Sequence, residues 1–271
     1  MRGILRAIPS SYGDSFSYFG DNFAGVFLGF SFRKLKTAYA GDCIRVRRTS
    51  DNTELDIGFV ANVLDEASLL AFCGANSGFV VKWYDQSGNA NDGVQLIASL
   101  QPRIVNAGAI ERITDTSIPI MINTTATSRL EITGVALPVT FTNIHIYDQR
   151  VTNIEYVGAS ANTFMYPSLN YSGTNIVRAD PNSATFGTEA VGKKIITTTK
   201  TASHDVVFYT NGVQKGISNN LGAGSGNLIH LLFRFANSNG NNATEIVLTN
   251  TDNTAGIVAL QTELNNYYGL Y

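Results

Sequence analysis

Alternating or short continuous runs of apolar residues, separated by clusters of Gly, Asn and Ser, recur along the chain from Ile44 onward. Such runs are typical of β-strands, and their regular spacing by turn residues favours an all-β sandwich over an α/β sheet. Asn211-Gly212 predicts a two-residue hairpin turn, because both positions tolerate positive φ. The segments expected to form strands are 44–48, 78–84, 129–132, 142–147, 154–157, 194–198, 206–210, 227–235 and 245–249.

Two segments predict short helices. Near 65–73, Asp65 can cap the first turn and Gly74 can end the helix. At the C-terminus, apolar residues recur at helical spacing and Gly269 occupies the stop position. The C-terminal stripe consists of Ile257, Leu260, Leu264 and Tyr267 or Tyr268.

Residues 1–32 differ in composition from the rest. They are rich in Gly and Ser and carry many aromatic residues that need burial. Two interpretations stay open: a first strand and loop packed on the sandwich, or an arm that docks into an assembly. We therefore divide the chain into 1–32 and a single sandwich domain over 33–271. The aromatic residues are Tyr12, Phe16, Tyr18, Phe19, Phe23, Phe27, Phe30 and Phe32.

Composition limits the partners. The 271 residues are 44% hydrophobic and 15% charged, with a formal net charge of −2, so a basic surface for nucleic acid is not expected. Arg45 and Arg47 share one face of a strand, where solvation or pairing with carboxylates is the simpler expectation. No apolar run is long enough for a membrane-spanning helix, and residues 1–11 do not read as a secretory signal.

Metal and cofactor motifs are not evident. Cys43 and Cys73 stand apart, as two small buried hydrophobic residues would. Asp85 and Asp92 could supply oxygen ligands to calcium, but an Asx-rich structural turn explains them better. Trp83 could stack on a sugar ring, although core packing is commoner at the end of an apolar strand. We therefore expect no cofactor and no metal.

The segment 40–95 carries a specific resemblance. It contains Cys43-Ile44-Arg45-Val46-Arg47-Arg48-Thr49-Ser50-Asp51-Asn52 and Trp83-Tyr84-Asp85-Gln86-Ser87-Gly88-Asn89. These motifs resemble the opening of the catalytic β-sandwich of the fungal arabinofuranosidase B family, and similar segments occur in tail and surface proteins of tailed bacteriophages. Looser similarity extends from 34 to 271. The resemblance implies a concanavalin/laminin-G-like antiparallel β-sandwich of the jelly-roll type.

The same resemblance implies that the enzyme chemistry is missing. Retaining glycosidases need two carboxylates about 5–5.5 Å apart. The family's acid/base Asp lies in a stretch that resembles Arg234–Gly240 of this chain, and its position is occupied by Ala236. Asp180 and Glu189 are the carboxylates nearest to the expected nucleophile. The adjacent cysteine pair of the family's sugar pocket is also missing.

We therefore expect a noncatalytic structural component of a bacteriophage virion: a fibre, decoration or tail-associated protein made in the host cytoplasm. Its expected partners are other virion proteins and further copies of itself, with host-surface glycan as a possible ligand. The alternative is an arabinofuranosidase-type glycoside hydrolase acting on cell-surface or plant polysaccharide. The loop that can hydrogen-bond sugar hydroxyls, if it is not simply solvated, consists of Asn237, Ser238, Asn239, Asn241 and Asn242.

Overall fold

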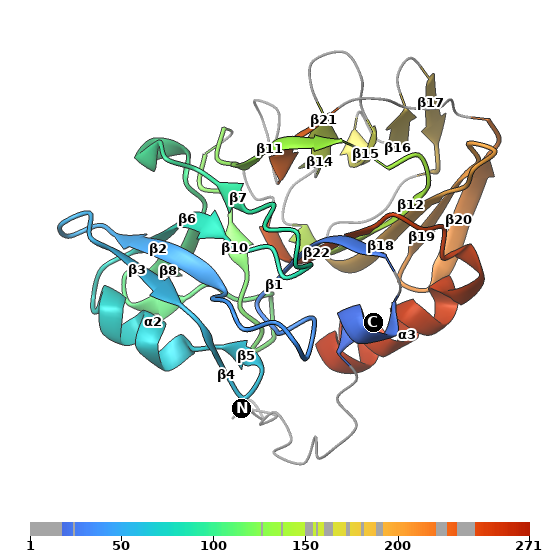
Figure 1. Cartoon of the computed structure of the whole chain (residues 1–271). Helices are drawn as coiled ribbons and strands as arrows, with labels where there is room; N and C mark the ends of the chain where they lie inside the picture. The colour runs from blue at the N-terminus through green and yellow to red at the C-terminus, as the bar shows by residue number, and fades with distance from the viewer. Residues whose placement is uncertain are drawn as a thin grey trace, which may run out of the picture.

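A computed structural model shows a mainly β protein (Figure 1). It describes residues 18–23, 25–125, 127–136, 138–149, 154–155, 157–159, 165–171, 174–179, 182–187, 192–220, 227–231 and 242–271. Within these residues every strand pairing is antiparallel. The expected all-β sandwich class is confirmed.

In the described part of the chain, the largest sheet has 16 strands and folds over on itself into two layers. The first layer contains β2 (Ile44–Arg48), β3 (Glu54–Ile57), β6 (Gly78–Trp83), β7 (Gly93–Val94), β8 (Arg103–Asn106), β9 (Ala109–Ile110), β11 (Leu130–Ala136), β14 (Val157–Ala159) and β21 (Asn227–Leu231). The strand β10 (Met121–Ile122) connects it to the second layer. The second layer contains β1 (Val26–Ser31), β12 (Phe141–Gln149), β18 (Gly192–Lys200), β19 (Val206–Thr210), β20 (Val213–Ser218) and β22 (Asn242–Thr249).

Two smaller sheets accompany the large one. A four-stranded sheet joins β13 (Ile154–Glu155), β15 (Met165–Tyr171), β16 (Thr174–Ala179) and β17 (Asn182–Thr185). A hairpin joins β4 (Phe59–Val60) and β5 (Val63–Leu64). The described chain also contains two short 3₁₀ turns, η1 (Ala98–Leu100) and η2 (Thr254–Gly256). A one-turn helix, α1 (Phe19–Asn22), precedes β1.

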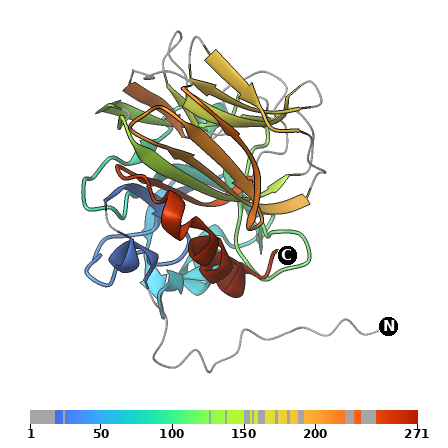
Figure 2. The same ribbon diagram turned by 90° about the vertical axis from the view of Figure 1, so that its right-hand side faces the viewer.

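Both faces of the second layer are covered. On β12, Phe141 and Tyr147 point into the core between the two layers, whereas Ile144 and Ile146 point into a second core on the opposite face. The helix α3 (Ile257–Tyr268) closes this second core, and Figure 2 shows it lying against the outside of the layer. Double burial explains why β18, β19 and β22 are buried at nearly every position.

The predicted helices and hairpin turn are confirmed. The Asp65 side chain accepts a hydrogen bond from the Ser68 N–H at the start of α2 (Glu66–Cys73), and Gly74 ends this helix. Gly269 ends α3 in the left-handed conformation, with φ of 59°. Asn211-Gly212 joins β19 to β20 with φ values of 49° and 76°.

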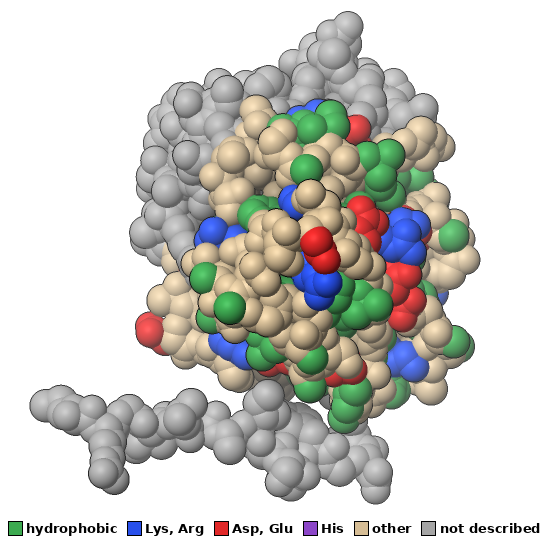
Figure 3. Space-filling view, turned by 90° about the vertical axis from the view of Figure 1, so that its left-hand side faces the viewer, with side chains coloured by type: hydrophobic (Ala, Val, Ile, Leu, Met, Phe, Trp, Pro, Cys, Tyr) green, Lys and Arg blue, Asp and Glu red, His purple; other side chains and the backbone are tan. Residues whose placement is uncertain are grey.

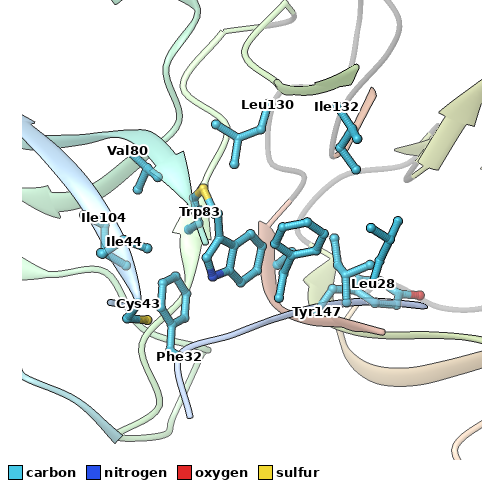
Figure 4. Close-up of a cluster of buried hydrophobic side chains, with 14 of the residues drawn as sticks. Leu28, Phe32, Cys43, Ile44, Val80, Trp83, Ile104, Leu130, Ile132 and Tyr147 are labelled. Atoms are coloured by element: carbon cyan, nitrogen blue, oxygen red, sulfur yellow. The ribbon is translucent and has the colours of Figure 1, made fainter. Parts of the chain in front are cut away.

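The aromatic segment before residue 33 contributes to the core. β1 pairs with β22, and Phe30 and Phe32 are buried against Trp83, with ring centroids 5.6 and 5.2 Å away. Figure 4 shows the Trp83 indole between Phe32 and Leu130, at the centre of this cluster. Tyr12 and Phe16 lie outside the described residues, so the docking arm stays a prediction.

Candidate functional site

Asp85, in the motif that carries the resemblance, organises a turn from both of its carboxylate oxygens. Oδ1 accepts hydrogen bonds from the backbone N–H groups of Gly29 and Ser87, each at 2.9 Å. Oδ2 accepts from the Ser87 hydroxyl at 2.7 Å and from the Asn91 N–H at 3.1 Å. A carboxylate that receives four hydrogen bonds is a structural acceptor, so the preferred interpretation as an Asx turn is confirmed.

Gln86 connects the same turn to the chain that follows β1. Its Oε1 accepts from the Leu35 N–H at 2.8 Å, and its Nε2 donates to the carbonyl oxygens of Ser31 and Arg33 at 2.9 and 3.1 Å. The amide is buried and all three of its partners are backbone groups. Both polar residues of the Asp85-Gln86 pair therefore stabilise the fold.

Trp83 and Tyr84 point to opposite sides of the first layer. Trp83 lies in the core, as expected, whereas the half-buried Tyr84 hydroxyl donates to Asp56 at 2.6 Å. Arg45 donates to both oxygens of Asp56, at 2.8 and 2.6 Å, and these hydrogen bonds lower the pKa of Asp56. The expected pairing of Arg45 with a carboxylate is confirmed. Figure 3 shows this side of the molecule, where basic and acidic side chains lie against each other.

Polar residues also line the face of the second layer that points between the two layers. On β12, the His145 imidazole is hydrogen-bonded through Nε2 to Asn143 Oδ1 at 2.8 Å, so this nitrogen carries the proton. Burial lowers the pKa of His145 to about 3, which keeps the ring neutral. On the neighbouring strands, the buried hydroxyls of Thr198 and Thr210 have no hydrogen-bond partner. We call Asn143, His145, Thr198 and Thr210 the inner polar face.

Two lysines share this face because they lie directly opposite inward-pointing residues of β12. Lys194 pairs with Tyr147 and Lys200 pairs with Phe141 in the β12·β18 ladder. Both lysines are at most 4% exposed, and burial lowers the pKa of Lys200. The inner polar face therefore combines amide, imidazole, hydroxyl and amine groups, which can donate and accept hydrogen bonds.

The carboxylates Asp148 and Glu245 of the second layer point away from the inner polar face. Glu245 on β22 accepts a hydrogen bond from Tyr268 of α3, on the outer side of the layer. Asp148 on β12 accepts from the N–H and the hydroxyl of Thr114, at 3.0 and 2.6 Å. Among the inward-pointing residues that the structure describes on β12, β18 and β19, none is a carboxylate. These strands thus contribute no acid or base of the glycosidase kind to the interior.

The predicted ligand loop is described only at its last residue. Asn237, Ser238, Asn239 and Asn241 lie outside the described residues, as do Ala236, Asp180 and Glu189. Asn242 begins β22 and is fully buried. Its Nδ2 donates to the Asp148 carbonyl at 3.1 Å, while its Oδ1 has no hydrogen-bond partner.

The described ranges contain neither a metal-binding cluster nor a membrane-spanning helix. Within those ranges no group of three or more His, Cys, Asp or Glu side chains could hold a metal ion. Cys43 and Cys73 are both free and buried, as expected for two small hydrophobic residues. No helix in that part of the chain is long and apolar enough to cross a membrane.

Comparison with known proteins shows which proteins have a similar fold. Residues 29–136 match the family model of the catalytic domain of α-L-arabinofuranosidase B. The fold is arabinofuranosidase-like. A GH54 α-L-arabinofuranosidase soaked with a cyclic sulfate inhibitor has a TM-score of 0.65 at 14% identity, over 88% of this chain. An arabinofuranosidase complexed with arabinofuranosyl-α-1,2-xylobiose has a TM-score of 0.63 at 15% identity, again over 88% of this chain.

The similarity is one of fold and covers part of each relative. This chain spans 62% of the length of both arabinofuranosidase structures. No curated protein sequence matches it. The segment that matches the family model, 29–136, includes Asp85, Gln86 and Asp56, whose side chains hold the scaffold together. The matched motifs therefore stabilise the fold, and any catalytic activity would depend on other residues.

The sequence did not suggest the inner polar face. β18 reads Gly-Lys-Lys-Ile-Ile-Thr-Thr-Thr-Lys, a pattern typical of a solvated strand, yet all but its first two residues are buried. His145 is a buried strand histidine that is hydrogen-bonded to Asn143. The usable signal was the spacing of Asn143 and His145, which puts both on one face of a strand.

Proposed function

We propose that this chain is a noncatalytic, carbohydrate-binding β-sandwich that serves as a structural component of a bacteriophage virion. The noncatalytic part rests on the resemblance of Arg234–Gly240 to the family's acid/base stretch, in which Ala236 corresponds to the Asp. A methyl group cannot donate a proton to a leaving group. The match of residues 29–136 to the family model, together with Ala236, is consistent with a chain that has kept the fold and lost the glycosidase activity.

The described acidic side chains of the matched segment support the same proposal. Most of them are engaged in scaffold contacts, so the segment 29–136 offers few carboxylates for proton transfer. The pairs are Asp56 with Arg45, Glu66 with Arg112, Asp92 with Lys82, Glu111 with Arg103, and Glu131 with Arg129. Asp85 is engaged by its four hydrogen-bond donors.

Carbohydrate binding is proposed from the fold and from the polar groups near the expected sugar site. One of the two arabinofuranosidase structures carries arabinofuranosyl-α-1,2-xylobiose, and the other carries a cyclic sulfate inhibitor. In this chain the loop Asn237, Ser238, Asn239, Asn241 and Asn242 supplies amides and a hydroxyl, which bind sugar hydroxyls without chemistry. Asn242 is fully buried at the start of β22, where it donates to the Asp148 carbonyl, so the proposed contact with a sugar falls to Asn237, Ser238, Asn239 and Asn241.

The virion role is proposed from the resemblance to phage tail and surface proteins and from Tyr12 and Phe16, aromatic residues before residue 33 that lie outside the described residues. Mass spectrometry of purified particles tests it directly. We expect this chain at a fixed copy number in particles that survive density-gradient purification. Its presence only as free protein in the lysate would contradict the virion role.

The alternative is a glycoside hydrolase of arabinofuranosidase type, favoured by the match to a catalytic-domain model. It would need two carboxylates about 5–5.5 Å apart for a retaining reaction or about 6.5–9.5 Å apart for an inverting one. Asp180 and Glu189 are the carboxylates nearest to the expected nucleophile of such a pair. Release of 4-nitrophenol from 4-nitrophenyl α-L-arabinofuranoside, abolished by Glu189→Gln or Asp180→Asn, would establish the hydrolase.

A further inference from the structure

Arg47, on β2, differs from the other arginines because it has no carboxylate partner. Each of the other arginine side chains that the structure describes forms an ion pair with an Asp or a Glu. Arg47 Nε donates to Gln101 Oε1 and Arg47 Nη1 donates to Asn52 Oδ1, both at 2.8 Å. Both acceptors are neutral amides, so the positive charge of Arg47 has no anion in contact with it.

The surroundings of Arg47 hold its guanidinium in one orientation. Val46 points into the core, so Arg47 points to the outer face of the first layer. Its guanidinium carbon lies over the Phe79 ring, 5.4 Å from the ring centroid. Gln101 is 2% exposed and its Nε2 donates to the Gln95 carbonyl at 2.9 Å, which fixes the amide that accepts from Arg47. A guanidinium held in this way loses little entropy when it binds a ligand.

The same guanidinium keeps hydrogen-bond donors for a ligand. Two of its five N–H groups are used in the contacts with Gln101 and Asn52, which leaves one on Nη1 and both on Nη2. The planar fork of a guanidinium matches the two oxygens of a carboxylate. Asn52 is exposed and uses its Oδ1 for Arg47, so its Nδ2 can donate to a hydroxyl beside that carboxylate.

Glu54 is the anion of the chain that could compete for this position. It lies opposite Arg47 in the β2·β3 ladder and is exposed. However, Arg47 extends over Phe79 of β6, and β6 and β3 lie on opposite sides of β2. The ion pairs that the structure describes on this face join Arg45 with Asp56 and Arg103 with Glu111, and they leave Arg47 open to an external anion.

We propose that Arg47 and Asn52 form a subsite for the carboxylate and a neighbouring hydroxyl of a uronic acid in an acidic polysaccharide. This inference rests on the proposed carbohydrate binding and adds the class of sugar. A neutral sugar offers no group for the unbalanced charge of Arg47, whereas a uronic acid offers both the carboxylate and the hydroxyls. The subsite belongs to β2 and the turn after it, and it does not include the loop before β22.

Calorimetric titration of the full chain with polygalacturonate and with its carboxyl-reduced, neutral form tests the proposal. We expect the acidic polymer to bind at least about tenfold more tightly than the reduced one, since charge-assisted hydrogen bonds are lost on reduction. Arg47→Gln should remove that preference, and Arg47→Lys should restore only part of it, because an ammonium lacks the planar fork. The matched control is Arg112→Gln, which removes the same charge from an arginine paired with Glu66 and should bind as the wild type does.

Glu54 gives a second test on the same face. Glu54→Gln removes the anion opposite Arg47 and should strengthen binding of polygalacturonate without changing binding of the reduced polymer. Unchanged circular dichroism and Trp83 fluorescence would show that each variant is folded. The comparison of the two polymers on the wild-type chain needs no variant.

Three results would overturn the inference. Equal binding of the two polymers, or Arg47→Gln with wild-type preference, would exclude a carboxylate contact at Arg47. Displacement of polygalacturonate by inorganic phosphate as readily as by free galacturonate would indicate a general anion site. Binding of neutral arabinan without any binding of polygalacturonate would overturn this inference and leave the proposed carbohydrate binding in place, whereas binding of neither would contradict both.

Discussion

Arg33 and Glu245 form a fully buried ion pair that joins residues 212 positions apart in the sequence. The guanidinium donates to both carboxylate oxygens, at 2.8 and 3.0 Å, and the two side chains are 3% and 0% exposed. Glu245 also accepts from the hydroxyls of Ser31 and Tyr268, each at 2.7 Å. The pair thus fastens β1, β22 and α3 to one another.

Removing one partner of this pair should be strongly destabilising. Glu245→Gln leaves a buried guanidinium without its counter-charge, so we expect the free energy of unfolding to fall by about 3–5 kcal/mol. The double variant Arg33→Met/Glu245→Leu should recover much of that loss, because no buried charge remains. Urea denaturation followed by Trp83 fluorescence measures both. The control is Asp51→Asn, which breaks the solvent-exposed ion pair of Asp51 with Arg48. It should change the free energy of unfolding only slightly.

The Asp85 turn should depend on its carboxylate and be independent of calcium. Asp85→Ala leaves the buried N–H groups of Gly29 and Ser87 without acceptors, which should lower the free energy of unfolding by about 3 kcal/mol. Glu54→Ala, on the exposed edge of β3, should change it far less. Neither calcium nor a chelator should shift Tm, and a clear rise of Tm with calcium would mean that the turn holds the ion.

His145 should make the fold less stable in mild acid. Its pKa is lowered from 6.5 to about 3 by burial, so between these values the unfolded chain binds a proton that the folded chain does not. Stability should therefore fall as pH drops below about 6.5, with a contribution of up to about 1.4 kcal/mol per pH unit from this group. His145→Gln should flatten the pH dependence between pH 6.5 and 4. An identical slope in the variant would contradict the neutral, buried imidazole.

Trp83 should tolerate phenylalanine better than its position in the core suggests. The indole Nε1–H is buried without a hydrogen-bond partner, so Trp83→Phe removes an unsatisfied donor together with some apolar contact. We expect Trp83→Ala to cost about 3–5 kcal/mol and Trp83→Phe clearly less. Urea denaturation followed by circular dichroism compares the two, since Trp83 is the single tryptophan. Equal losses would indicate that the donor has a partner.

Local patterns predicted much of the fold. Asp65 and Gly74 mark the ends of α2, Gly269 ends α3, and Asn211-Gly212 makes the hairpin, because each choice depends on neighbouring residues only. The pairing of β1 with β22 was not predictable in this way. Nor was the Arg33–Glu245 pair, because it depends on which distant strands become neighbours.

Burial of polar strands was the main obstacle to predicting the interior. Lys194 and Lys200 are buried because they point into the space between the two layers, beside Tyr147 and Phe141. Their apolar stems make this burial possible, but the stems give no sequence signal. The concanavalin/laminin-G-like and jelly-roll details, the division at residue 32 and the glycan-binding loop stay predictions.

The central claim, binding without cleavage, is tested most directly by measuring both on one sample. The purified chain is titrated calorimetrically with arabinose-containing oligosaccharide and with host-surface polysaccharide, and each mixture is then analysed chromatographically for released sugar. We predict saturable binding to at least one glycan, weakened by Asn239→Ala, with no released sugar. Release of arabinose by the wild-type chain would contradict the claim, as would the absence of binding to every glycan tested.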